Sequence, residues 1–263
     1  MKVVFPHDGG CQLKIFPQIA KAMRSFARRH ERYFRSLVFE MRNERLIKGN
    51  ILDAGAYIGD NVAPWAYMNP DITVYAIEPT HIYCEGLTRI AENNNLSNVK
   101  IIRTALSDTS KTLYSNSQKG ATRRFSNQGK FQENAVSLDH LLSDKQIDDI
   151  GFLHLDLEGG EKDAIIGGSA LIEKCKPVIA WEQWTRPKSK KWGWREQLGE
   201  EVEEIENHLK SKYGYITYMI DESASFKNYR PYLVRNFISI LPELENSIKR
   251  LTTFKLERLI QLD

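Results

Sequence analysis

The stretch at positions 51–60 reads Ile-Leu-Asp-Ala-Gly-Ala-Tyr-Ile-Gly-Asp and decides the fold class. An apolar run ends at Asp53, Gly55 follows after one residue, and Gly59 precedes a segment with helical character. Glycine lets a backbone pass close to a ligand or a neighbouring strand, so this pattern predicts a strand–turn–helix unit that binds a cofactor. A dinucleotide loop would instead carry Gly-x-Gly-x-x-Gly. The carboxylate of Asp53 favours a cofactor with an ammonium and a sulfonium over one with phosphates.

A second strand supports this interpretation. Positions 74–79 read Val-Tyr-Ala-Ile-Glu-Pro, so Glu78 stands at the tip of an apolar run that follows the first strand–helix unit. A carboxylate at that place can accept hydrogen bonds from both ribose hydroxyls of a nucleoside. We therefore predict that Asp53 and Glu78 hold two ends of one nucleoside cofactor.

Short apolar runs alternate with helical stretches from residue 50 onward. Parallel strands need such helical crossovers, so the alternation predicts an α/β protein with a parallel sheet. After residue 220 a further strand follows with no clear helix before it, which predicts an antiparallel hairpin at one side. The expected strands are Ile51–Ala54, Thr73–Ile77, Val99–Ala105, Gly151–Asp156, Val178–Glu182, Tyr215–Ile220 and Val234–Leu241, and the expected helices lie near 60–68, 80–94, 138–147 and 161–174.

Three segments fall outside this alternation. Residues 1–48 are expected to form an N-terminal extension, helical over 17–48, whose arginines either form a solvated face or cap the acceptor site. Residues 49–241 would form the main domain, and 242–263 a C-terminal amphipathic helix. The polar segment 107–135 is expected to be a surface insertion, a loose hairpin beside the ligand crevice.

Bulk composition excludes several classes of protein. The chain of 263 residues is 41% hydrophobic and 27% charged, which is typical of an ordinary globular protein. Its net charge of +3 does not call for nucleic acid or a membrane as a partner. The three cysteines are far apart and include no Cys-x-x-Cys pair, which favours a reducing compartment. No apolar run has the roughly 18 residues of a membrane span, and the N-terminus lacks a signal-like apolar stretch, so we expect a cytoplasmic protein.

The segment 151–161 carries the residues expected to do chemistry. It reads Gly-Phe-Leu-His-Leu-Asp-Leu-Glu-Gly-Gly-Glu, and the alternation of a strand puts His154, Asp156 and Glu158 on one face or edge. Its place beside the first strand is the switch point of an α/β sheet, where ligands bind. Glu161 follows a glycine pair and suits the first turn of the next helix, so we interpret it as structural.

The whole pattern resembles the FkbM family of class I methyltransferases. Their motifs Asp-x-Gly-Ala-Asn-x-Gly, Glu-Pro, Ala-Leu-Ser-Asp and Asp-x-Glu-Gly-x-Glu occur here in the same order, except that Tyr57 replaces the asparagine. The resemblance implies a Rossmann-like fold with a seven-stranded, mostly parallel sheet, helices on both faces, and S-adenosylmethionine as methyl donor. The cofactor-binding residues it implies are Asp53, Gly55, Ala56, Tyr57, Gly59, Glu78, Pro79, Ala105, Leu106 and Asp108, with Asp108 as the candidate for the adenine amino group.

The family also implies a hydroxyl acceptor, often on a sugar. An alcohol is a poor nucleophile until its proton leaves, so the site needs a general base or a metal. The candidates are Asp156, Glu158, His154 and Glu182, with Asp156 first because it ends the strand beside the cofactor strand. His154 could equally be a satisfied, partly buried histidine. Two or three of the carboxylates could equally hold magnesium, although no dense carboxylate cluster is visible in the sequence.

A loop rich in tryptophan and basic residues follows the fifth strand. Aromatic faces stack on the C–H faces of sugars, whereas the same tryptophans could simply cover the core. The residues concerned are Trp181, Trp184, Trp192, Trp194, Arg186, Lys188, Lys190 and Lys191. A basic and aromatic loop would also suit single-stranded nucleic acid, but the modest charge and the lack of a basic stripe make such a partner less favoured.

Four functions are therefore considered for this sequence. The first is O-methylation of a sugar, a glycan or a similar small molecule. The second is methylation of RNA or protein, against which the absence of an Asn/Asp-Pro-Pro-Tyr motif counts. The third is a module that binds S-adenosylmethionine and only scaffolds a partner, and the fourth is a nicotinamide-dependent oxidoreductase. The sequence predicts neither the oligomeric state nor the identity of the acceptor.

Overall fold

A computed structural model of the chain describes residues 1–29, 32–117, 124–185, 197–220, 233–251 and 256–258. Its centre is a sheet in which eight strands of the described part lie in the order β13-β11-β12-β10-β9-β3-β4-β5. The strands from β10 to β5 run parallel, whereas β12 is antiparallel to both β10 and β11. The bounds are β3 (Asn50–Ala54), β4 (Val74–Ile77), β5 (Val99–Ile102), β9 (Ile150–Leu155), β10 (Val178–Thr185), β11 (Ile216–Ile220), β12 (Leu233–Ile240) and β13 (Leu256–Arg258).

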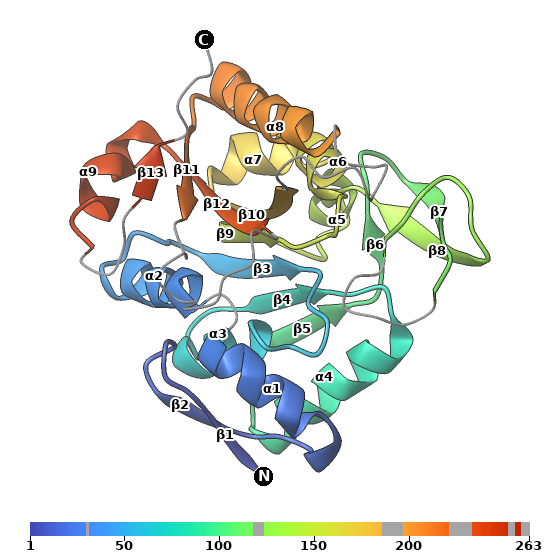
Figure 1. Cartoon of the computed structure of the whole chain (residues 1–263), viewed down its shortest axis with the longest axis vertical. Helices are drawn as coiled ribbons and strands as arrows, with labels where there is room; N and C mark the ends of the chain where they lie inside the picture. Colours follow the sequence, from blue (N-terminus) through green and yellow to red (C-terminus); the bar gives the residue numbers. More distant parts are fainter. Residues whose placement is uncertain (30–31, 118–123, 186–196, 221–232, 252–255, 259–263) are drawn as a thin grey trace.

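The predicted Rossmann-like α/β fold is confirmed. Each of the seven expected strand runs contains a strand of this sheet, and the expected hairpin is the antiparallel pair of β11 and β12. Helices cover both faces (Figure 1). Those of the main domain are α3 (Val62–Met68), α4 (His81–Asn93), α5 (Leu138–Ser143), α6 (Glu161–Ile166), α7 (Ser169–Cys175) and α8 (Gln197–Tyr213).

Two helix predictions need correction. The single helix expected at 161–174 is two helices that break at Gly167, where a Cβ atom would lie 2.3 Å from the backbone oxygen of Ser107. Asp139 then caps the second of them, accepting hydrogen bonds from the amides of Ala170 and Leu171 at 2.9 Å each. Helix α8 was not predicted, although Val202, Ile205, Leu209 and Tyr213 recur at helical spacing along the side that packs on the core.

Alternation along the strands divides the core into two clusters, one on each face of the sheet. Ile51 of β3 and Phe152 of β9 face one cluster, which also receives α3, α4 and the two N-terminal helices α1 (Pro17–Arg29) and α2 (Arg32–Asn43). Leu52 and Leu153 face the other, which receives α5 to α8. Because both faces are covered, the central strands are buried along their whole length, as in other parallel sheets.

The N-terminal extension packs onto the first face. It begins with a hairpin that was not predicted, β1 (Lys2–Phe5) and β2 (Cys11–Lys14), and continues with α1 (Pro17–Arg29) and α2 (Arg32–Asn43). The arginine of this extension that packs deepest is Arg35, which is fully buried. Its guanidinium lies 3.0 Å from the carboxylate of Asp60 and 3.7 Å from that of Asp8, and it also donates to the backbone oxygen of Asp60. Arg35 therefore ties the extension to the loop after β3.

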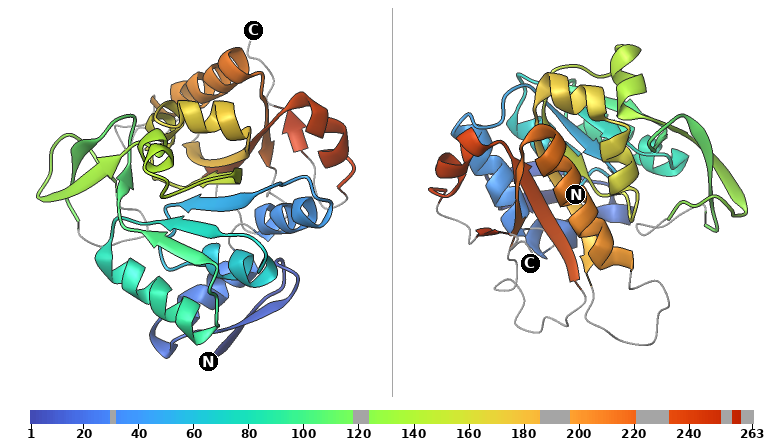
Figure 2. Two further views of the ribbon diagram at one scale, coloured as in Figure 1. Left: turned by 180° about the vertical axis from the view of Figure 1, so that it is seen from behind. Right: turned by 90° about the horizontal axis from the view of Figure 1, so that it is seen from above.

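The polar insertion is a small sheet of its own. Strands β7 (Lys111–Ser115) and β8 (Phe131–Val136) form the antiparallel hairpin that was expected, and β6 (Ala105–Leu106) pairs with β8 in parallel. This sheet projects from the body beside the carboxyl ends of β4 and β5, as the front view in Figure 1 and the back view in Figure 2 both show.

The C-terminal helix expected over 242–263 is wrong for the described residues. A short 3-10 turn (η2, Pro242–Leu244) and the four-residue helix α9 (Glu245–Ile248) are followed by the strand β13. Strand β13 pairs with the outer edge of β11, so the backbone groups of that edge find partners in the ladder. Among the described residues, no helix has the length and apolar character that crossing a membrane requires.

Candidate active site

A cavity of about 550 Å³ opens at the carboxyl ends of β3, β4, β9 and β10. This is the crevice where open α/β sheets bind their ligands. Eleven of the fourteen predicted site residues line this cavity, and three do not. The lining includes Asp53, Gly55, Ala56, Tyr57, Glu78, Pro79, Ala105, Leu106, Asp156, Glu158 and Glu182 and does not include Gly59, Asp108 or His154.

The two glycines of the first loop have different tasks. Gly55 has φ +91°, and a Cβ there would lie 1.8 Å from the backbone oxygen of Asp156, so this position allows two strand ends to approach each other. Gly59 has φ +80°, and a Cβ there would lie 2.2 Å from the side chain of Leu87 in α4. Gly59 therefore serves helix packing, and it does not line the cavity.

Glu78 is held in place by the backbone. It is 6% exposed; Oε2 accepts a hydrogen bond from the amide of Tyr57 at 3.0 Å, and Oε1 accepts one from the amide of Thr80 at 2.7 Å. A carboxylate can accept about four hydrogen bonds, twice the number that these two amides donate. Tyr57 itself has φ +43°, a region that asparagine enters more readily than tyrosine, and this explains why the motif usually carries asparagine.

Asp53 and His154 form a buried pair. Oδ1 of Asp53 lies 2.6 Å from Nδ1 of His154, and both residues are at most 2% exposed. The imidazole stacks on Phe34 at 4.9 Å and meets the edge of Trp65 at 5.6 Å, measured between ring centroids. Asp53 reaches the cavity whereas His154 lies behind it. His154 is thus placed to orient Asp53, and its position argues against the predicted role as a base.

The adenine end of the predicted site differs from the expectation. The carboxylate of Asp108 accepts hydrogen bonds from Lys111 at 2.6 Å and from Ser107 at 3.0 Å. The hydrogen bond from Lys111 lowers the pKa of Asp108. Lys111, Ser107 and Asp163 line the cavity in place of Asp108. Sequence reasoning missed Lys111 because it belongs to the insertion, and Asp163 because it lies in α6, one turn after the motif.

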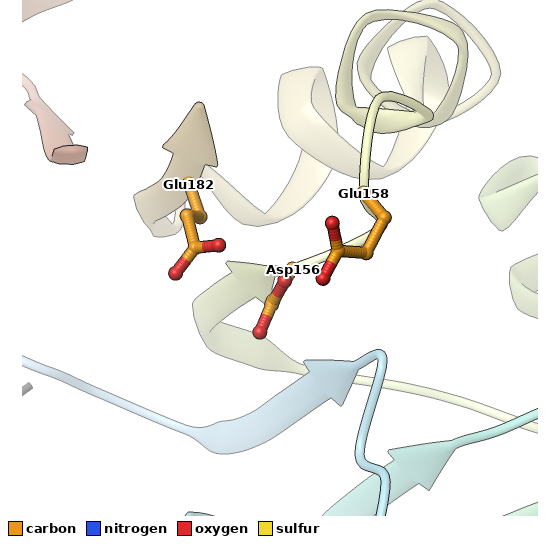
Figure 3. Close-up of side chains that lie close together, drawn as sticks. All are labelled: Asp156, Glu158 and Glu182. Atoms are coloured by element: carbon orange, nitrogen blue, oxygen red, sulfur yellow. The ribbon is translucent and has the colours of Figure 1, made fainter. Parts of the chain in front are cut away.

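Three of the four predicted catalytic residues converge. Asp156 follows β9, Glu158 lies in the turn before α6, and Glu182 belongs to β10; Figure 3 shows the three carboxylates pointing toward one another. One oxygen from each lies within 4.8 Å of the others. The register explains part of this, because Trp181 pairs with Leu155 and the next residues along each strand are Glu182 and Asp156. Glu158 has φ +56°, which turns the chain so that its side chain joins the other two.

Glu161 is buried behind this cluster. It is 1% exposed, and burial raises the pKa of its carboxyl to about 7. Its oxygens accept hydrogen bonds from the amides of Leu157 (2.7 Å) and Gly159 (3.0 Å) and from the side chain of Gln183 (3.2 Å). As the sequence indicated, Glu161 begins α6 and does not line the cavity.

The structure describes only some of the tryptophans that were predicted to stack on a sugar. Trp181 is fully buried, stacks on Phe237 at 4.2 Å and donates to the hydroxyl of Ser239, so it belongs to the core. The side chain of Trp184 and residues 186–196, with Trp192, Trp194 and the four basic residues, lie outside the described residues. Two aromatic residues that the sequence did not single out line the cavity, Phe26 of α1 and Phe125 of the insertion, and Phe26 brings the N-terminal extension to the site.

Comparison with known families decides the class of protein. The family model of the methyltransferase FkbM domain matches residues 53–217, more than half of the chain, and this range includes every predicted site residue. The chain belongs to the FkbM methyltransferase family. No match is found among curated proteins.

Solved structures of methyltransferases match this chain at low sequence identity. Methyltransferase FkbM from Methylobacillus flagellatus KT is 15% identical with a TM-score of 0.48; the match covers 84% of this chain and 54% of that protein. This chain therefore spans about half the length of that FkbM structure. Precorrin-6y C5,15-methyltransferase from Geobacter metallireducens GS-15 is 13% identical (TM-score 0.43, 78% and 87% covered). TYW2 from M. jannaschii in complex with AdoMet is 16% identical (TM-score 0.42, 95% and 84% covered).

The residues present fit S-adenosylmethionine, the cofactor that an FkbM methyltransferase implies. Glu78 offers two oxygens whose positions are fixed by backbone amides, as a ribose with two hydroxyls requires. Asp53 offers a buried carboxylate to the positive groups, and the close turn at Gly55 leaves room beside it. Ala105 and Leu106 supply an apolar wall that suits an adenine ring. A volume of about 550 Å³ lies within the range of pockets for small molecules and cofactors.

Proposed function

We propose that this methyltransferase transfers the methyl group of S-adenosylmethionine to a hydroxyl oxygen of a sugar, a glycan or a similar small molecule. One observation carries the proposal: Asp156, Glu158 and Glu182 meet in the same cavity as Asp53 and Glu78, the two acids assigned to the cofactor. S-adenosylmethionine supplies a methyl carbon that its positive sulfur already activates. The protein must therefore position the acceptor oxygen and remove its proton.

The cluster of carboxylates suits both tasks. Carboxylates accept hydrogen bonds, and a sugar offers several hydroxyl donors in a row. We assign proton removal to Asp156, because it stands at the end of β9 next to the cofactor strand β3. When the acceptor oxygen bonds to the methyl carbon, the carbon–sulfur bond would break, S-adenosylhomocysteine would leave, and the hydroxyl proton would pass to the carboxylate of Asp156. Glu158 and Glu182 would then hold the neighbouring hydroxyls and so fix which oxygen faces the methyl group.

Magnesium is the alternative for the same three residues. Carboxylate oxygens are the ligands that hard cations prefer, and a bound cation would also lower the pKa of an acceptor hydroxyl. The sequence favoured a base without metal because no dense carboxylate cluster was visible. The structure brings one oxygen of each carboxylate within 4.8 Å of the others, so this argument against a metal no longer holds. Activity with a chelator and with added magnesium distinguishes the metal from the base.

The experiment is incubation with S-adenosylmethionine carrying a labelled methyl group and a panel of sugars, glycans, RNA and protein. Mass spectrometry then identifies the product and the methylated atom. We expect label on an oxygen of a sugar or glycan. Label on nitrogen, or on RNA or protein alone, would replace this proposal by the alternative acceptor class. Binding of S-adenosylhomocysteine without transfer to any class would favour the scaffold.

A matched pair of variants ties the result to the cavity. Glu182→Gln alters a cavity residue that is 5% exposed, whereas Glu204→Gln alters an exposed acid of α8 whose partner is Lys162 at 2.7 Å. We expect Glu182→Gln to lower transfer at least tenfold while S-adenosylhomocysteine still binds. Glu204→Gln should leave both methyl transfer and the binding of S-adenosylhomocysteine unchanged. Equal activity of the two variants would contradict a role of the cluster.

A further inference from the structure

Glu161 contacts both chain segments that carry the outer members of the carboxylate cluster, although it does not itself line the cavity. On one side it accepts hydrogen bonds from the loop between β9 and α6, at the amides of Leu157 and Gly159. On the other side it accepts a hydrogen bond from Gln183, the residue after Glu182 in β10. A single buried carboxyl thus joins a loop and a strand that meet at the site.

The loop contacts determine where Glu158 points. The two amides that bond to Glu161 belong to the residues immediately before and after Glu158. Glu158 and Gly159 have φ +56° and +107°, a conformation that an L residue such as glutamate rarely adopts by itself. Such a conformation persists when surrounding bonds over-determine it. Glu161 provides two of these bonds.

The strand contact determines where Glu182 lies. Adjacent residues of a strand point to opposite faces, so Gln183 faces away from the side chain of Glu182. The side chain of Gln183 is 1% exposed and bonds to Oε2 of Glu161 at 3.2 Å. This bond fixes β10 against the start of α6 at the level of the cluster. A shift of β10 would move Glu182 relative to Asp156.

Simple capping of α6 does not account for these contacts. A capping carboxylate bonds to amides in the first turn of a helix, as Asp139 does with Ala170 and Leu171 of α7. Apart from its own amide, the partners of the Glu161 carboxylate precede its helix or belong to β10. Burying a carboxyl is unfavourable, as its raised pKa of about 7 reflects, and an apolar side chain could fill the same space. An apolar side chain would remove the acceptor of the amides of Leu157 and Gly159 and would leave Gln183 only its longer bond to Glu201, at 3.5 Å.

We propose that Glu161 is a positioning residue that holds the loop 157–160 and strand β10 at the spacing where Asp156, Glu158 and Glu182 converge. The inference rests on the proposed function, because it assigns Glu161 to the geometry of the acceptor site. Glu161 touches neither cofactor nor acceptor, and it acts through the loop amides and Gln183.

The first test separates positioning from stability. Glu161→Gln keeps the shape of the side chain but turns an amide NH2 toward donors. On the acceptor found in the labelled panel, kcat should fall about 10- to 100-fold, since small misplacements of catalytic groups cost that much. The dissociation constant of S-adenosylhomocysteine should stay within about twofold. Asp139→Asn, the matched loss of a carboxylate with two amide partners, should lower Tm and leave kcat unchanged.

A second pair of residues provides a rescue. Glu161→Gln combined with Gln183→Glu reverses amide and carboxyl and restores the bond between the two side chains, so kcat should recover in part. If Glu161→Gln and Asp139→Asn lose only stability, to the same extent and with wild-type kcat, the positioning role is overturned. A double variant with no more activity than Glu161→Gln alone would overturn the contribution through Gln183.

A third readout needs no acceptor. Amide hydrogen exchange is measured on the protein bound to S-adenosylhomocysteine, at residues 158–160. Glu161→Gln should speed exchange there at least tenfold, and Asp139→Asn should not. Unchanged exchange in Glu161→Gln overturns the inference whatever the acceptor is. A wild-type protein that methylates nothing in the panel would contradict the proposed function alone, and the exchange rates would still decide the role of Glu161.

Discussion

Oδ1 of Asp53 lies 2.6 Å from Nδ1 of His154, and this bond connects the cofactor loop to the strand that carries the proposed base. The two residues are directly paired in the register of β3 and β9. A carboxylate can only accept, so Nδ1–H of the imidazole donates and fixes the direction of Asp53. The histidine in turn is fixed by the rings of Phe34 and Trp65.

The first prediction follows from this pair. His154→Phe keeps an aromatic ring against Phe34 but removes the donor to Asp53. A lost hydrogen bond to a charged group costs about 1.5–3 kcal/mol, so calorimetry should show S-adenosylhomocysteine binding weakened about tenfold or more. His140→Phe, which changes an exposed histidine of α5, is the control. Unchanged cofactor binding together with a large loss of kcat would instead return His154 to the role of a base.

The second prediction concerns Glu78. Glu78→Ala removes the proposed acceptor of the ribose hydroxyls and also the partner of the amides of Tyr57 and Thr80. We expect S-adenosylhomocysteine to bind more weakly by about 1.5–3 kcal/mol in calorimetry. Glu85→Ala, at an exposed acid of α4 near His81, should bind as the wild type does. Equal affinity of both variants would remove Glu78 from the cofactor site.

The third prediction tests the close approach at Gly55. Alanine there would be strained by φ +91° and would place its Cβ 1.8 Å from the backbone oxygen of Asp156. Gly214→Ala is the matched control, because Gly214 has φ +76° with no heavy atom within 4 Å of such a Cβ. We expect about 1 kcal/mol of lost stability for the control from backbone strain alone. Gly55→Ala should lose at least about 3 kcal/mol more or fail to fold, as urea unfolding would show. Equal losses of stability in Gly55→Ala and Gly214→Ala would mean that β3 and β9 can move apart to make room for the added Cβ.

The fold could be predicted from the sequence where each element has a pattern of its own. The runs of β3, β4, β9 and β10 are apolar and end in polar residues, so their positions were correct. Helix α8 also has such a pattern, with Val202, Ile205, Leu209 and Tyr213 at spacings of three and four, and the sequence could have placed it. The break at Gly167 depends on the backbone of Ser107, a contact between segments sixty residues apart that no local pattern contains. Strand β13 likewise forms by pairing with the edge of β11, a contact that its own sequence does not reveal.

The site residues likewise separate into those that the sequence could place and those that it could not. Asp53 and Glu78 could be placed because strand tips of a parallel sheet meet at one edge. The convergence of Glu158 with Glu182 could not, because it depends on the positive φ of Glu158 and on the register of β9 with β10. Strand alternation suggested that His154 and Asp156 share an environment. The strand ends at Leu155, however, so only His154 enters the core while Asp156 reaches the cavity.

The fourth prediction concerns pH. Burial raises the pKa of Glu161 from 4.5 to about 7, so the folded state binds this proton more tightly than the unfolded state. The stability it contributes is fully present below pH 4.5 and is lost as pH rises through 7. Between pH 4 and pH 8, the unfolding free energy of the wild type should therefore fall, relative to that of Glu161→Gln, by on the order of 3 kcal/mol. Urea unfolding at several pH values measures it. Parallel curves for the two proteins would mean that folding leaves the pKa of Glu161 unchanged.

The last prediction separates a general base from a metal at Asp156. Asp156→Asn keeps the shape of the side chain but cannot take a proton. If Asp156 is the base, kcat should fall about 10²–10⁴-fold with nearly intact cofactor binding. Chelator would then have no effect, and activity would rise with pH through one ionisation. Glu158→Gln and Glu182→Gln would be milder, because they would lose only hydrogen bonds to the acceptor.

A metal at the cluster gives a different set of results. Chelator should abolish activity, and added magnesium or manganese should restore it. Glu158→Gln and Glu182→Gln should then be about as damaging as Asp156→Asn, because each of the three converging carboxylates would be a ligand. Calorimetry with magnesium alone gives an independent check, since all three variants should lose binding. An Asp156→Asn protein that keeps most of its rate would contradict both versions, and because His154 lies behind Asp53 outside the cavity, the proton would then have to leave through Glu158 or Glu182.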